Sequence, residues 1–202
     1  MNATRTLPEN YALSAGFNLK DRRMLLIMNI GGLVLLIFFG WLFTKLAILL
    51  RPADAAAFLT LRWEGIGAFL TIVIVLAILI VTITLHEAIH GLGFYVLANA
   101  RPIFAFRGAY AYAAAPDWYI PRNKYLVTAL APFVVISLIG IGLIPVVPAT
   151  WIAPLVLACV INASGAVGDL WVALLLLRQP PDALSNDRGD EIKIFTPVPA
   201  AA

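Results

Sequence analysis

The chain has few charged residues and almost no cysteine. Asp, Glu, Lys and Arg make up 12% of its 202 residues, about half of the share in soluble domains. The single cysteine, Cys159, excludes an intrachain disulfide and a cysteine-based zinc site. The net charge is +3, but the basic residues lie in short clusters between apolar runs. This pattern indicates membrane topology and does not favour nucleic-acid binding.

Hydrophobic residues, at 62% of the chain, gather in four long stretches. The stretches run from about 24 to 50, 66 to 97, 125 to 147 and 151 to 177. The second contains 20 uncharged residues, Ile66 to Leu85, which suffice to cross a bilayer. The first is too long for a signal peptide, although Ala53-Asp54-Ala55 resembles a cleavage site. We therefore expect an all-α integral membrane protein with four transmembrane helices.

The polar segments set the expected domain organisation and topology. We expect an N-terminal cytoplasmic tail at 1–23, a membrane domain at 24–178, and a C-terminal tail at 179–202. Residues 51–64 read as a short loop or an interfacial helix. The segments expected on the side of the termini carry eleven Lys and Arg, against three on the other side. This asymmetry predicts that both termini lie in the cytoplasm, in a cell membrane.

The connection between the second and third spans, residues 98–124, predicts a small interfacial β-hairpin. Ile103-Phe104-Ala105-Phe106 and Ala109-Tyr110-Ala111-Tyr112 flank a turn at Gly108. One interpretation is an aromatic belt with basic anchors at the membrane surface. The other is an exposed strand edge that accepts an extended peptide.

His86-Glu87-Ala88-Ile89-His90 lies near the end of the second span. Histidines four residues apart share one helix face, so both imidazoles can bind one metal ion. Glu87 is turned by roughly 100° from His86, beside the metal, where it could take a proton from bound water. This is the zinc-peptidase motif, and it predicts His86 and His90 as ligands of Zn²⁺ and Glu87 as the catalytic base.

A catalytic zinc site needs a third protein ligand and an open position for water. Val96 stands where the metzincin pattern would place a third histidine, and the next glutamate is Glu191. Asp169 is the only other acid in the apolar spans, which makes it the candidate third ligand. It lies ~13 Å inside the end of its span, and the histidines lie ~10–16 Å from the same face.

Asn162 precedes Asp169 by two helical turns on the same side of the expected helix. It could contact a substrate carbonyl or a developing oxyanion, or make an interhelical hydrogen bond. Two other interpretations of the motif are a polar patch that stabilises the bundle and a haem or metal-transport site. Neither needs Glu87 beside the histidines or Asp169 at matching depth.

Three segments resemble DUF3267, the family of putative zincin peptidases, which are small bacterial membrane proteins. They are 86–94, 119–122 and 162–170. More distantly the chain is similar to site-2 proteases, intramembrane zinc metalloproteases. In those enzymes a glycine follows the aspartate ligand, whereas Leu170 follows Asp169 here. The resemblance implies proteolytic activity.

Together these features predict a membrane-embedded zinc metalloprotease that hydrolyses peptide bonds of membrane-associated protein or peptide substrates. The alternative is a non-catalytic multi-pass membrane protein with a structural or vestigial metal site. The expected partners are such a substrate and the lipid bilayer.

Overall fold

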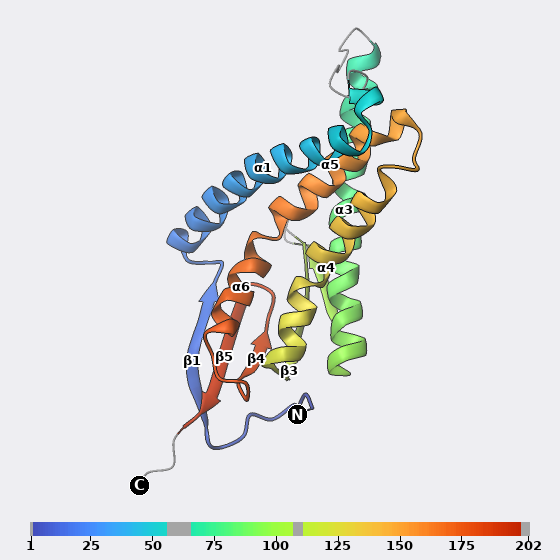
Figure 1. Cartoon of the computed structure of the whole chain (residues 1–202). Helices are drawn as coiled ribbons and strands as arrows, with labels where there is room; N and C mark the ends of the chain where they lie inside the picture. The colour runs from blue at the N-terminus through green and yellow to red at the C-terminus, as the bar shows by residue number, and fades with distance from the viewer. Residues whose placement is uncertain (1, 56–65, 107–110, 199–202) are drawn as a thin grey trace. The chain divides into compact units, whose positions relative to one another are not determined.

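The computed structural model describes residues 2–55, 66–106 and 111–198 (Figure 1). In chain order, the elements described are β1 (Tyr11–Asn18), α1 (Arg22–Leu50), η1 (Pro52–Asp54), α3 (Ile66–Ala98), β2 (Ile103–Phe106), β3 (Ala111–Pro121), α4 (Arg122–Leu143), α5 (Ala149–Gly165), α6 (Val167–Leu177), β4 (Leu184–Asp187) and β5 (Glu191–Pro197). The expected hairpin turn at 107–110 and most of the expected 51–64 connection lie outside the described residues.

Three of the described helices, α1, α3 and α4, are long and apolar enough to cross a membrane. The pair α5 and α6 makes a fourth candidate if the two count as one broken span. The break follows Gly165: the Ala166 N–H still donates to the carbonyl of Asn162, but the ψ of Ala166, 11°, leaves the helical range. Gly165 and Gly168 flank this break, and glycine disfavours a continuous helix.

The expectation of an all-α protein with one small hairpin needs correction, because the structure contains a five-stranded antiparallel sheet. Its strand order is β1-β5-β4-β3-β2. The segments expected as tails supply β1, β4 and β5, and the expected hairpin supplies β2 and β3. In β5 the alternation of Glu191, Ile192, Lys193 and Ile194 places the two isoleucines in the core. This period-2 pattern is typical of a strand with one buried face.

The described chain forms two compact units. The first contains Met1–Asn29, Glu87–Pro132 and Gly168–Ala202, and therefore the whole sheet. Its core includes Phe17, Phe94, Ile120, Leu176 and Ile194. These side chains come from β1, α3, β3, α6 and β5, so the sheet and the helix segments of this unit share one apolar core.

The second unit contains Ile30–His86 and Phe133–Val167, all of it helical or connecting chain where described. Its core is built around Phe43, Ile144, Ile152 and Cys159. Arg51 follows α1 and donates through Nη1 to the carbonyls of Pro145 and Val147, at 3.1 and 3.0 Å. It therefore satisfies backbone carbonyls in the α4–α5 connection, which lies outside both helices.

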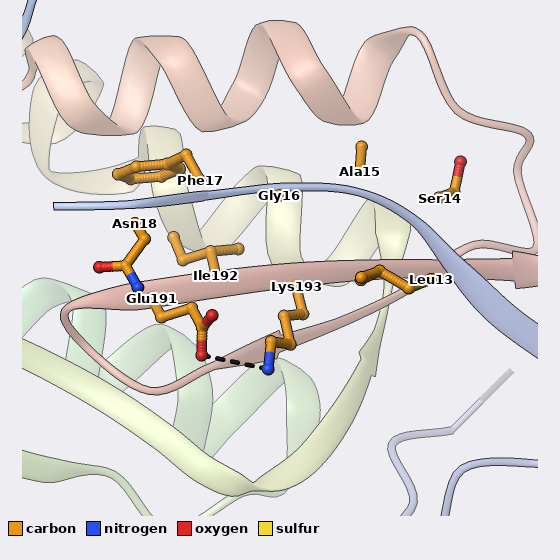
Figure 2. Close-up of a pocket in the computed structure, with 9 residues that line it drawn as sticks. All are labelled: Leu13, Ser14, Ala15, Gly16, Phe17, Asn18, Glu191, Ile192 and Lys193. Carbon is orange, nitrogen blue, oxygen red and sulfur yellow. Dashed lines mark ion pairs between the residues drawn. The ribbon is translucent and has the colours of Figure 1, made fainter. Parts of the chain in front are cut away.

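β1 and β5 pair closely at one end of the sheet (Figure 2). A Cβ on Gly16 would collide with the carbonyl oxygen of Ile192, so only glycine permits this approach. A cavity of about 390 Å³ lies over the pair, lined by Leu13–Asn18 and Glu191–Lys193. Glu191 and Lys193 form an ion pair of 3.2 Å there, and none of the predicted site residues lines it.

β4 is a buried strand made largely of polar residues. Asn186 donates from Nδ2 to the carbonyls of Pro116 and Trp118, at 2.7 and 3.0 Å. Asp187 accepts from the hydroxyl of Tyr125 at 2.6 Å and from the backbone N–H of Gly189 at 2.7 Å. Burial nevertheless raises the pKa of Asp187 to about 6, because these hydrogen bonds only partly offset the loss of water around the carboxylate.

Candidate metal centre

α3 carries the two histidines and the glutamate of the motif on one uninterrupted helix. Leu, Ile and Val dominate its sequence up to Leu85, so most of the surface before the motif is apolar. His86 and His90 are only 9% and 8% exposed. Burial of both imidazoles in such a helix indicates a specific role, because polar groups in an apolar segment need partners.

His90 lies between two oxygens of the same unit. Its Nδ1 is 3.0 Å from the backbone carbonyl oxygen of Thr128 in α4, and its Nε2 is 3.2 Å from Oδ1 of Asp169 in α6. A carbonyl can only accept, so Nδ1–H must be the donor to Thr128. In the neutral ring Nε2 then carries a lone pair that faces a carboxylate oxygen. Two such atoms at this distance require a positive charge between them, either a proton or a metal ion.

The imidazole of His86 is also oriented by a hydrogen bond at Nδ1, but with a different partner. Its Nδ1 lies 2.9 Å from Oδ1 of Asn162 in α5, and Asn162 is only 2% exposed. The amide oxygen can only accept, so Nδ1–H donates to it and Nε2 is left with a lone pair. Metal-binding histidines commonly have their second ring nitrogen fixed by such a partner. The oxyanion role of Asn162 stays a prediction beside this contact.

His86, His90 and Asp169 each offer one ligand atom, and these atoms all lie within 4.8 Å of one another. Two imidazole nitrogens and one carboxylate oxygen match the ligand sets of catalytic zinc sites, which use three protein ligands. The residues present therefore fit a zinc ion. The structure brings Asp169 to the motif although almost 80 positions of sequence separate them.

Glu87 has a hydrogen-bond partner outside the group formed by His86, His90 and Asp169. Its Oε2 accepts a hydrogen bond of 2.7 Å from the backbone N–H of Ala113 in β3. In the sheet Ala113 is paired with Phe104 of β2, whose ring lies against Gly91 of α3. The hairpin strands thus contact α3 at two neighbouring points and fix the orientation of the Glu87 carboxylate.

Contacts of α4 with α3 and with α6, all within the sheet-containing unit, support this arrangement. A Cβ on Gly93 would lie 2.9 Å from Cγ2 of Thr128, so glycine lets α3 approach α4 at the turn after His90. Arg122 at the start of α4 donates from Nε to the carbonyl of Leu176 near the end of α6, at 2.9 Å. The helices that carry Thr128 and Asp169 are therefore tied to one another.

Sequence reasoning named all three residues of the convergent group but missed the contacts of Thr128 and Ala113. Both act through backbone atoms, which a residue motif does not display. Gly91 and Gly93 allow close packing against Phe104 and Thr128, whereas no described atom outside the local helix backbone lies within 4 Å of a Cβ built on Gly165 or Gly168.

The fold and site are those of a membrane protein with a zincin-type helix, in which two histidines and a glutamate follow the His-Glu-x-x-His spacing. A family model, DUF3267, described as "Putative zincin peptidase", matches residues 79–184, just over half of the chain. The chain belongs to this family. The matched range includes His86, Glu87, His90, Asn162 and Asp169. No curated protein and no solved structure matches the chain significantly.

Proposed function

We propose that the protein is a membrane-embedded zinc metallopeptidase that hydrolyses peptide bonds of membrane-associated proteins or peptides. The observation that carries the proposal is the convergence of His86, His90 and Asp169 beside Glu87. A group of two neutral imidazoles and a carboxylate is suited to hold Zn²⁺ and leave a position open. When bound there, zinc supplies Lewis acidity, which polarises a carbonyl and lowers the pKa of water toward ~7.

Glu87 supplies the proton transfers in this proposal. Its carboxylate accepts the proton of the attacking water and passes it to the leaving amine. The hydrogen bond from Ala113 holds Oε2, so the carboxylate keeps a fixed orientation. Thr128 and Asn162 orient the two imidazoles through their Nδ1–H groups. Asn162 is also a candidate for contact with the substrate carbonyl.

The sheet supports a four-span topology for this enzyme. β1 precedes α1, β2 and β3 lie between α3 and α4, and β4 and β5 follow α6. Strands that share hydrogen bonds must lie on the same side of the membrane, so an even number of crossings must separate them. Two crossings by α1 and α3 meet this condition, and so do α4 and one broken span formed by α5 and α6.

The site then lies near the side of the membrane that carries the sheet, because Glu87 bonds directly to β3. The excess of basic residues in the segments on this side favours the cytoplasm. Substrates would therefore be membrane proteins or peptides cleaved within or beside the bilayer near its cytoplasmic face.

The second candidate function is a non-catalytic membrane protein with a structural metal site. Structural zinc sites are normally closed by four protein ligands. Among the described residues, the His/Cys/Asp/Glu group at this site has three members. That count favours catalysis.

The proposed function can be tested on the full chain in lipid nanodiscs with a defined peptide mixture and mass spectrometry of the products. We expect new peptide termini, their loss after chelation, and their return after addition of Zn²⁺. One bound zinc per chain with no cleavage of these peptides or of membrane proteins co-reconstituted in the discs would favour the structural site. Protein that binds no zinc would refute both functions.

A further inference from the structure

α4 contains a proline, Pro132, well inside a helix that runs from Arg122 to Leu143. Proline has no backbone N–H, so it cannot donate to the carbonyl four residues earlier. That carbonyl belongs to Thr128, which is 0% exposed. Water cannot readily replace the missing donor there, and a buried carbonyl without a partner is costly.

The donor that meets this carbonyl is the imidazole of His90, with Nδ1 at 3.0 Å from the Thr128 oxygen. Two features permit the contact. Gly93 lets α3 come close to α4 at Thr128. Pro132 removes the helical N–H that would otherwise compete for the same oxygen. The Pro132 side chain is itself fully buried.

We infer that Pro132 is a positioning residue, which reserves the Thr128 carbonyl for His90 and so directs His90 Nε2 toward the metal position. This inference deepens the proposed function and rests on it only where zinc affinity is concerned. One hydrogen bond satisfies both groups: the Thr128 carbonyl of the interrupted helix gains a donor, and the Nδ1–H of the His90 imidazole gains an acceptor.

The substitution Pro132→Ala tests the inference, because it restores the helical N–H without adding bulk. It removes a helix breaker, so the metal-free protein should keep or raise its thermal midpoint. Zinc affinity should nevertheless fall, by roughly 10-fold or more, as expected when a partner that orients a ligand is weakened. A merely structural proline would not produce these opposite changes. Pro154→Ala is the matched control, because Pro154 also lies inside a helix, α5.

A second readout needs no metal. The chain contains only two histidines, so ¹⁵N-histidine labelling gives two imidazole spin systems, which His86→Ala assigns. In metal-free Pro132→Ala, the Nδ1–H proton of His90 should move upfield and exchange faster with water, while that of His86 stays. Pro154→Ala should change neither signal nor the zinc affinity.

Unchanged His90 signals in Pro132→Ala would overturn the inference, even if zinc affinity fell, since the loss would then have another cause. Changed signals with unaltered zinc affinity would overturn it as well. If the wild-type protein binds no zinc, the proposed function fails, and the signals of the metal-free protein alone then decide the role of Pro132.

Discussion

Oδ1 of Asn162 lies 2.9 Å from Nδ1 of His86, so the asparagine is hydrogen-bonded to a predicted metal ligand on another helix. The contact is an interhelical hydrogen bond, which is one of the two interpretations of Asn162 that the sequence left open. As an interhelical hydrogen bond it stabilises packing, and as the partner of His86 it fixes the tautomer that exposes Nε2. Support of His86 and stabilisation of an oxyanion predict different values of kcat at saturating zinc when Asn162 is replaced.

Asn162→Ala should lower zinc affinity by roughly 10–100-fold, because His86 loses the acceptor for Nδ1–H. If Asn162 acts only through His86, saturating zinc should restore kcat close to the wild-type value. If it also stabilises an oxyanion, kcat should stay about 10²–10³-fold lower at saturating zinc. Zinc titration by chelator competition, combined with kcat at saturation, separates these cases. Unaltered affinity would show that the contact does not support the metal.

Asp169→Ala should reduce zinc affinity by at least roughly 10–100-fold, since it removes a carboxylate that faces Nε2 of His90 at 3.2 Å. Zinc content after detergent purification, followed by chelator competition, measures the change. Asp117→Ala is the control, because Asp117 is an exposed acid on β3. Equal zinc binding by the Asp169 variant and wild type would refute the ligand assignment.

Glu87→Gln should keep zinc bound and the fold intact while abolishing cleavage of any substrate found. The amide retains the size and an acceptor oxygen for the Ala113 N–H, but it cannot accept the proton. Zinc stoichiometry and product formation should be measured together, with the exposed Glu9→Gln as control. Loss of zinc would make Glu87 a ligand, and full activity would place proton transfer elsewhere. A stable inactive variant could also trap a bound substrate for identification.

Reporter fusions test the four-span topology that the sheet supports. Fusions at Asp54 and at Pro148 should report one compartment, and fusions at the C-terminus should report the cytoplasm on the other side. The physical reason is that β1 and β5 pair and must share a side. A C-terminus on the side opposite the cytoplasm would refute the predicted orientation. A C-terminus on the same side as Pro148 would contradict a crossing by α5 and α6.

Asp187 predicts an unusual pH dependence of stability. Its pKa is raised from 3.8 to about 6, so between these values the native state binds more protons than the unfolded state. The free energy of unfolding should therefore fall as pH rises through this window, by about 3 kcal/mol at most.

Thermal midpoints of the metal-free protein from pH 4 to 7 check this slope. Asp187→Asn should flatten it, because the amide carries no charge and can still accept from Gly189 and donate to Tyr125. Asp117→Asn should leave the slope as in wild type. A wild-type stability that rises with pH more steeply than that of Asp187→Asn would contradict the assignment.

The long helices were predictable because their sequences are uniformly apolar over bilayer length. Boundaries at Leu50, near Ala98 and at Leu177 follow directly from where charge or proline returns. The break at Ala166 was not predicted, since glycines at 165 and 168 are compatible with either close packing or a broken helix. The sheet was missed outside the hairpin because the polar segments 1–23 and 179–202 were expected as tails, the latter with Asp182, Asp187 and Asp190. In fact Asp187 is buried and bonded to Tyr125.

In the candidate site, the side-chain ligands could be predicted from the sequence, whereas the contacts made by backbone atoms could not. Residue types with rare chemistry in an apolar setting, such as His86 and Asp169, could be found by elimination. The contacts of Thr128 and Ala113 use a carbonyl and an amide that every residue possesses. Of the two, only the Thr128 contact has a counterpart in the sequence, because Pro132 lacks the backbone N–H four residues after Thr128.

The pairing of β1 with β5 has a consequence for how the protein is made. β1 precedes α1 in the chain, whereas β5 follows α6, so β1 is synthesised well before its partner. β1 cannot take its place in the sheet until β5 is available to pair with it. β4 also arrives late, and it lies between β5 and β3, the strand that holds Glu87. The sheet beside Glu87 can therefore be completed only after the helices from α1 to α6 have been synthesised.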